Sequence, residues 1–287
     1  MRKYFDLYWA FIFISYGLIP MLDQVLSEDW KNPTLKQIIE LERDQRYRMV
    51  IYFMVALDVF IFSSEVGNIG EFTFFNALPR LFVLANSYAL GIIISHELTH
   101  KENFLDRAVG SLILIKNCYM HYTIDHIYGH HKRVSTPEDP SSAPRGITLY
   151  QFVRKTVKNT FLSAYEMYPK LVVLGTIASF AFVMVLYKLY GWKVVLIHLF
   201  AAAGSIQLLE TANYMEHYGL QRKKLADGTY EKVTIRHSWN AAHRISNLFF
   251  LKLQRHSDHH ENSSKPYQTL STYEDSPQLP HGYPVCV

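Results

Sequence analysis

Apolar residues are concentrated in separate runs along the chain, with charged segments between them. We expect membrane spans over roughly 7–21, 49–62, 81–95, 171–187 and 194–209. Each run is near or slightly below the ~20 residues that cross ~30 Å of hydrocarbon. Their short uncharged cores would also suit buried helices of a soluble protein, but so many runs in one chain favour membrane insertion.

A sixth apolar run, over 109–115, has about half that length and is flanked by Arg107 and Lys116. It is too short to cross a bilayer, so we expect a re-entrant or interfacial helix near 109–120. The pattern as a whole predicts an all-α fold, a polytopic membrane helical bundle that forms a single domain over residues 1–287.

The loops between the runs differ in charge. Residues 22–48 carry five Lys and Arg side chains, whereas residues 63–76 carry none. By the positive-inside rule the first of these loops is cytoplasmic, or on the matrix side, and the second is not. Counting spans from there places the ends of the third and fifth runs and the long C-terminal segment on the cytoplasmic or matrix face.

Composition limits the kinds of partner and of metal ligand that the protein can use. The 29 Lys and Arg exceed the 25 Asp and Glu by only four, which excludes a nucleic-acid surface and fits a basic loop face at an anionic membrane. The mean hydropathy of −0.01 hides the clustering of apolar residues. Cys118 and Cys286 are far apart and form no CxxC pair, so any metal must use nitrogen or oxygen ligands.

Histidines are clustered at four places on the predicted cytoplasmic face. They are His96 and His100; His126, His130 and His131; His217; and His256, His259 and His260. His96 and His100 are four residues apart and share one face of a helix, and His126 and His130 repeat that spacing. His131 is then turned about 100° round the helix, toward a second metal.

Nine histidines are too many for one zinc ion. A structural zinc takes four ligands and a catalytic zinc usually takes three and a water, so the set predicts two metals with open positions for oxygen. Imidazole suits iron, copper, nickel or zinc, so ligand type alone leaves the metal open. We therefore predict a histidine-rich di-metal site at the cytoplasmic (or matrix) face.

Other polar residues are candidates for supporting roles. Metal-bound imidazoles usually donate their second N–H to a carboxylate, and acids recur beside the histidines, with a solvated loop charge as the alternative for each. These acids are Glu97, Asp125, Asp139, Glu216 and Asp258. The remaining histidines lack the spacing and are expected to be structural, with His121 the best candidate for a spare ligand: His121, His198, His237, His243 and His281.

The second and third apolar runs contain further candidates. Asp58 is an ionisable group at membrane depth, which indicates either helix packing against polar neighbours or a place in the site. Phe53, Phe60, Leu84 and Ile92 are candidates to line a hydrocarbon channel to the metals, with ordinary helix packing as the alternative.

The residues around the histidines resemble those of the integral-membrane alkane monooxygenase (AlkB-type) family over nearly the whole chain. The matching stretches are HELTHK at 96–101, GHH at 129–131, TPEDPSSA at 136–143, NYMEHYGL at 213–220, HSWN at 237–240, LQRHSDHH at 253–260 and LPHGYP at 279–284. Membrane fatty-acid desaturases share the histidine spacing, but the flanking residues separate the two groups. The resemblance implies that all nine clustered histidines are iron ligands.

The resemblance also implies a function. It implies a di-iron centre with O2 as co-substrate, which hydroxylates the terminal carbon of alkanes or similar alkyl chains in a lipid membrane. No flavin, haem or iron–sulfur motif is present, so a rubredoxin- or ferredoxin-like donor is expected to supply electrons, with no nucleic-acid partner. The alternatives are a hydroxylase or desaturase acting on a fatty acyl, sterol or alkyl-aromatic substrate, and a catalytically silent structural subunit of a membrane-protein complex.

Overall fold

This computed structural model describes residues 2–286, in which all the regular elements are helices and no β-strand occurs. Its first half contains α1 (Arg2–Phe13), η1 (Ile14–Leu18), α2 (Ile19–Val25), α3 (Leu35–Arg43), α4 (Gln45–Gly67), η2 (Ile69–Glu71), α5 (Phe74–Thr99), α6 (Phe104–Lys116), α7 (His121–Ile124), η3 (Asp125–His130) and α8 (His131–Arg133). Its second half contains α9 (Leu149–Met167), α10 (Pro169–Tyr190), α11 (Trp192–His217), α12 (Arg244–Phe249), α13 (His256–Glu261), η4 (Tyr267–Thr269) and α14 (Tyr283–Cys286).

Within residues 2–286, four helices are long and apolar enough to cross a membrane: α4, α5 from Asn76 onward, α10 and α11. They contain the predicted runs from the second to the fifth, which confirms a multi-pass membrane bundle. The first predicted run lies on α1, η1 and α2, which follow one another without a break from Arg2 to Val25. None of those three segments is long enough alone, so the first span stays a prediction.

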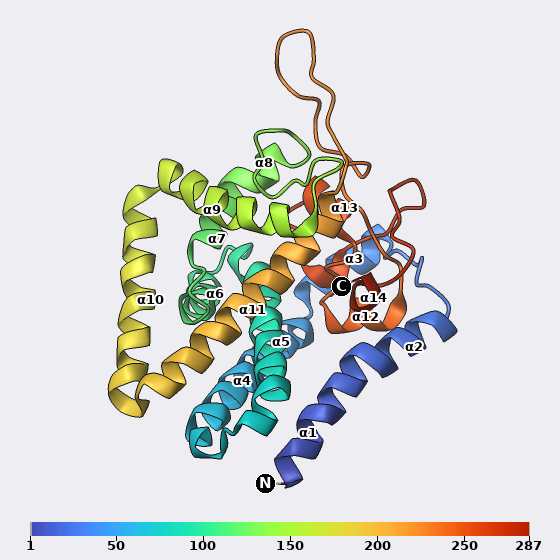
Figure 1. Ribbon diagram of the computed structural model, residues 1–287. Helices are drawn as coiled ribbons and strands as arrows, with labels where there is room; N and C mark the ends of the chain where they lie inside the picture. Colours follow the sequence, from blue (N-terminus) through green and yellow to red (C-terminus); the bar gives the residue numbers. More distant parts are fainter. Residues whose placement is uncertain (1, 287) are drawn as a thin grey trace.

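Local sequence explains how the second half is laid out. Thr148 and Gln151 form a capping box that starts α9, and Pro169 starts α10, where its missing N–H costs no hydrogen bond. Gly191, with φ of +82°, lies between α10 and α11 and lets the chain reverse. As a result α9 lies across the ends of α10 and α11 that are uppermost in Figure 1.

The half-length apolar run forms α6, a helix of 13 residues and therefore about 20 Å long, which is too short to cross a bilayer. At its end, Lys116 Nζ lies 2.7 Å from Asp58 Oδ1, in the second half of α4. The end of α6 therefore lies level with the interior of a spanning helix, which favours the re-entrant alternative. It also explains Asp58 as half of a buried ion pair that joins α4 to α6.

The C-terminal segment packs against the histidine-bearing end of the bundle. One buried cluster joins α4, α5 and α6 to this segment: Ile51, Ile94, Leu98, Ile113, Leu251, Tyr267 and Leu270. Arg255, which is 1% exposed, donates to Asp29 Oδ2 at 3.0 Å and so fixes the start of α13 to the loop after α2. The red α12–α14 region in Figure 1 thus covers the end of α5.

The four residues proposed to line a channel lie either on the outer surface of the helices or within packed clusters. Phe53 and Phe60 are 69% and 68% exposed on α4 and face outward. Leu84 and Ile92 are buried in two different clusters of packed side chains. Because α4 and α5 are apolar on all sides, the sequence does not distinguish an outward side chain from an inward one.

Candidate metal centre

All nine clustered histidines meet where α5, the η3–α8 segment, the end of α11 and α13 come together. Each residue offers one nitrogen, and these nitrogens form two groups in which every atom lies within 4.8 Å of the others. One group, called here the five-histidine group, contains His96, His100, His126, His131 and His259. The other, the four-histidine group, contains His130, His217, His256 and His260.

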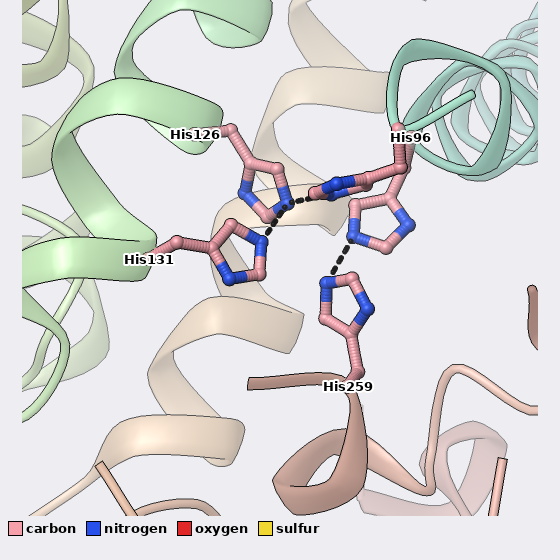
Figure 2. A group of neighbouring side chains, drawn as sticks. His96, His126, His131 and His259 are labelled. Carbon is pink, nitrogen blue, oxygen red and sulfur yellow. Dashed lines mark hydrogen bonds between the residues drawn. The ribbon is translucent and has the colours of Figure 1, made fainter. Parts of the chain in front are cut away.

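The five-histidine group is held by three separate parts of the chain (Figure 2). The Nε2 atoms of His96 on α5 and His259 on α13 are 2.9 Å apart. His126 Nε2 lies 3.1 Å from His100 Nε2 and 3.0 Å from His131 Nε2. The imidazole rings therefore point toward one common space rather than outward into solvent.

The four-histidine group is buried at every position. His256 Nε2 lies 3.1 Å from His217 Nε2 at the end of α11 and 3.0 Å from His260 Nε2, one turn further along α13. His130 Nε2 is buried and has no hydrogen-bond partner among the described residues. A buried nitrogen of this kind is costly unless something else occupies its lone pair, and a metal ion would do so.

The assignment of His126, His130 and His131 to faces was wrong. His126 shares its group with His131, five residues on, while His130 belongs to the other group. The reason is the π-helical turn η3, in which the His131 N–H donates to the His126 carbonyl, so that residues five apart lie one turn apart. Gly129 lies within this turn and leaves room for the side chains of Arg133 and Asp125, whose ends a Cβ there would overlap.

Burial keeps most of these imidazoles neutral. It lowers the pKa of His100 to about 4, and it lowers the pKa of His126, His256 and His259 well below 6.5, with neighbouring histidines adding to the effect for these last three. A neutral imidazole keeps a free lone pair, which is the form that binds metals. The donors are therefore ready to bind a cation at neutral pH.

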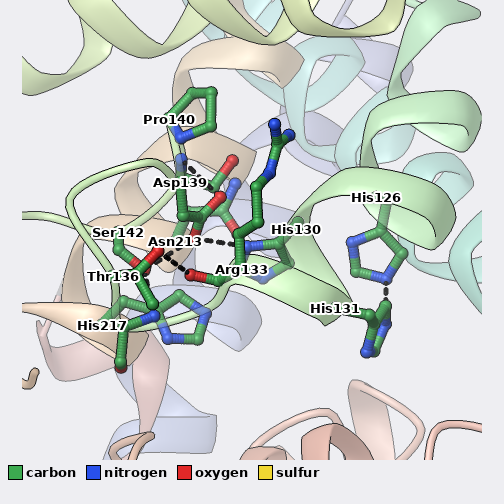
Figure 3. Close-up of polar contacts among 12 residues, drawn as sticks. His126, His130, His131, Arg133, Thr136, Asp139, Pro140, Ser142, Asn213 and His217 are labelled. Atoms are coloured by element: carbon green, nitrogen blue, oxygen red, sulfur yellow. Dashed lines mark hydrogen bonds and ion pairs between the residues drawn. The ribbon is translucent and has the colours of Figure 1, made fainter. Parts of the chain in front are cut away.

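Asp139 supports the four-histidine group directly. Its Oδ2 lies 2.8 Å from His130 Nδ1, and it also accepts a hydrogen bond of 2.6 Å from the Ser142 hydroxyl (Figure 3). Burial acts to lower the pKa of His130, but the Asp139 carboxylate raises it above 6.5. The carboxylate thus fixes the ring through Nδ1 and leaves Nε2 to face the group.

Glu216 lies beside the same group in a different way. Its Oε2 is 3.3 Å from His256 Nε2, the nitrogen that faces the other imidazoles, and its Oε1 accepts a hydrogen bond of 2.6 Å from the Tyr283 hydroxyl. Tyr283 and Ser142 were not among the predicted site residues. Their only signal was their place in the LPHGYP and TPEDPSSA stretches.

The other three predicted acids make no hydrogen bond to a histidine among the described residues. Glu97 pairs with Lys101, Asp125 with Arg133 and the Ser163 hydroxyl, and Asp258 with Lys265. These contacts fix the backbone near the groups. The remaining five histidines, His121, His198, His237, His243 and His281, lie in neither group.

A small hollow adjoins the five-histidine group. His96, His259 and Glu97 form one side, and the rest of its lining is apolar: Ile93, Phe250, Leu251, Leu253 and Leu270. Most of these apolar residues belong to the C-terminal segment rather than to the spans. Its volume is about 10 Å³, room for no more than about one water molecule, so it marks an apolar side of the group and holds no alkyl chain as it stands.

Comparison with known proteins gives the family. The family model described as fatty acid desaturase matches residues 74–286. Alkane 1-monooxygenase 2 of Pseudomonas aeruginosa is 35% identical over 96% of this chain and 78% of its own length, and the alkane 1-monooxygenase of Acinetobacter baylyi is 33% identical over 93% and 69%. This chain belongs to the alkane 1-monooxygenase family.

Membership of the alkane 1-monooxygenase family makes this multi-pass membrane protein an oxidoreductase and confirms the resemblance of its motifs. A more distant relative is XylM, the xylene/toluene monooxygenase hydroxylase component of Pseudomonas putida. XylM is 22% identical over 96% of this chain and 78% of its own length. Both histidine groups of this alkane 1-monooxygenase family member lie within residues 74–286, the region that the family model matches.

Proposed function

We propose that this protein is a di-iron monooxygenase that hydroxylates the terminal carbon of alkanes or similar alkyl chains. The single observation that supports it most is the convergence of nine histidine nitrogens into two adjacent groups, in a chain whose relatives are named alkane 1-monooxygenases. The five-histidine group would hold one iron and the four-histidine group the other. When bound, the irons would supply the oxidising chemistry with O2.

The donor set fits iron better than a structural zinc. Zinc in proteins is usually tetrahedral and satisfied by four ligands, whereas the larger group offers five imidazole nitrogens. Imidazole is a good ligand for iron, and an alkyl C–H bond offers no polar handle for acid–base chemistry. A redox metal is therefore the component that such a substrate requires.

The protein's own residues would orient the imidazole rings and exclude water from the site. Asp139 holds the His130 ring through Nδ1, and Tyr283 holds Glu216 beside His256. Ile93 and Leu270 place an apolar wall beside His96, which would keep water away from that side of the group. Electrons would come from a rubredoxin- or ferredoxin-like donor at the face that carries the histidines.

Product analysis tests the proposal. The purified protein is loaded with iron, reconstituted in lipid with a rubredoxin and its reductase, and given octane, hexadecane, p-xylene or a fatty acid under 18O2. We expect a 1-alkanol carrying 18O from an alkane, with two irons per chain. A benzylic alcohol as the main product would favour chemistry like that named for XylM.

Matched variants separate catalysis from folding. His126→Ala removes a member of the five-histidine group, whereas His281→Ala removes a half-buried histidine outside both groups. We expect the first variant to lose product and the second to keep it. Protein that folds but holds no iron would reject the oxygenase and support the structural-subunit alternative.

A further inference from the structure

A second cavity, of about 330 Å³, lies against α9 and apart from both histidine groups. Its lining is mainly apolar: Cys118, Tyr119, His121, Val157, Lys158, Phe161, Leu162 and Ile206. At about 30 Å³ for each water-sized group, it has room for roughly ten such groups, comparable to a segment of an alkyl chain. None of the nine clustered histidines lines it, so the proposed oxidation does not use it.

The cavity lies near one end of the spanning helices. Met120, next to its lining residues, contacts Gly175 of α10, six residues and therefore about 9 Å from the start of that helix at Pro169. On its other side is α9, which crosses the ends of α10 and α11 (Figure 1). The cavity thus extends from the level of the helix ends into the apolar part of the bundle.

Helix α9 has the composition of a helix at a membrane surface. It carries Arg154, Lys155 and Lys158 against a single acid, Glu166. None of its three cations has a carboxylate within ion-pair distance in the described part of the chain. Basic amphipathic helices of this kind attract anionic lipid headgroups.

Two polar groups in the cavity are unmatched. Lys158 brings an exposed ammonium group to its rim, and His121 Nε2 is buried without a hydrogen-bond partner among residues 2–286. Burial lowers the pKa of His121 to about 4, so the ring is neutral at physiological pH and donates one N–H. A cation, a neutral donor and an apolar wall together match a negatively charged oxygen head on an alkyl chain.

We propose that this cavity binds one anionic phospholipid of the surrounding bilayer. Its phosphate accepts from Lys158 Nζ and from His121 in the tautomer that carries a proton on Nε2, and one acyl chain lies along Phe161, Leu162 and Ile206. A free fatty carboxylate has the same charge and chain, but the basic residues along α9 favour a headgroup that stays at the membrane surface.

Lipid binding to the purified protein in uncharged detergent tests the site. Native mass spectrometry would count bound phosphatidylglycerol, phosphatidylcholine and oleate, and thermal unfolding would follow stabilisation by each. We expect phosphatidylglycerol to bind best and Lys158→Gln to weaken it about fivefold. The matched variant Lys155→Gln removes the same charge from the same helix outside the cavity, and should weaken binding less than about twofold.

A second variant tests the nitrogen. His121→Phe keeps an aromatic ring but removes the N–H that donates to the phosphate, a group that both phospholipids carry, so binding of both should weaken by a similar factor while an acyl chain still fits. Equal binding of the two phospholipids to the unaltered protein would overturn the proposal. So would equal losses in Lys158→Gln and Lys155→Gln, or binding of oleate without phosphatidylglycerol.

Discussion

The two histidine groups lie side by side but have unlike surroundings. The four-histidine group is fully buried, with Asp139 on one of its rings and Glu216 beside another. The five-histidine group has no carboxylate hydrogen-bonded to its rings in the described chain, includes the half-buried His100 and His131, and adjoins an apolar hollow. One group therefore has negative charge beside its rings, and the other has apolar side chains beside its rings.

This difference suggests a division of roles. Carboxylates near a metal stabilise its more positive state and strengthen its binding, so an ion in the four-histidine group should be held more tightly. An ion in the five-histidine group would have neutral imidazoles and an apolar wall around it, so we expect the alkyl substrate to approach on that side. The experiments below test that division, beginning with the largest expected effect.

Removing one ring from each group should give the largest loss. His260→Ala and His100→Ala should each lower product formation by more than about 100-fold, since even residues that only support ligands contribute 10- to 100-fold. Metal analysis should find about one ion per chain in each variant. Two ions with normal activity in either variant would contradict the grouping.

Asp139→Asn tests the charge on the four-histidine side. Losing the carboxylate that fixes His130 should lower metal affinity by about 10- to 100-fold, measured by competition with a chelator. Asp125→Asn is the matched control, because Asp125 is also buried but contacts Arg133 and Ser163 instead of a histidine. If both variants behave alike, the special role of Asp139 is wrong.

Ile93→Phe tests access on the five-histidine side. A larger side chain in the hollow should leave the metal content unchanged and shift the substrate preference, with hexadecane losing about three- to tenfold relative to octane. Product ratios from mixed substrates give the answer. An unchanged ratio would mean that alkyl chains approach from elsewhere.

Tyr283→Phe should have the smallest effect. Without the hydroxyl that donates to Glu216 at 2.6 Å, that buried carboxylate loses a partner, and we expect a cost of about 1–3 kcal/mol in stability. Thermal unfolding measures it, and activity should fall only a few-fold. In Tyr273→Phe the affected acid, Asp258, keeps Lys265, so the loss should be smaller.

Much of the architecture could be predicted from patterns that depend on spacing alone. The four long helices follow from the length of the apolar runs, and α6 follows from a run that is too short to cross. The nine histidines could be found because their spacing and neighbours are distinctive. Each of these features depends only on residues that lie close together in the sequence.

What could not be predicted depends on partners distant in sequence. Asp125 and Asp139 both lie near clustered histidines in the sequence, yet only Asp139 makes a hydrogen bond to an imidazole. The fold instead places Arg133 and Ser163 beside Asp125. His131, and not His130, shares a group with His126 because the chain forms a π turn there. No simple sequence pattern predicts such a turn. The outward position of Phe53 could not be read from a helix that is apolar on all sides.

The two groups are joined by covalent bonds as well as by packing. His130 and His131 are consecutive residues that serve different groups, and so are His259 and His260. Consecutive Cα atoms are about 3.8 Å apart, so the spacing between the groups is set twice by a single peptide unit. A one-residue insertion or deletion at either pair would displace histidines of both groups at once. Neither group can therefore be changed there without disturbing the other.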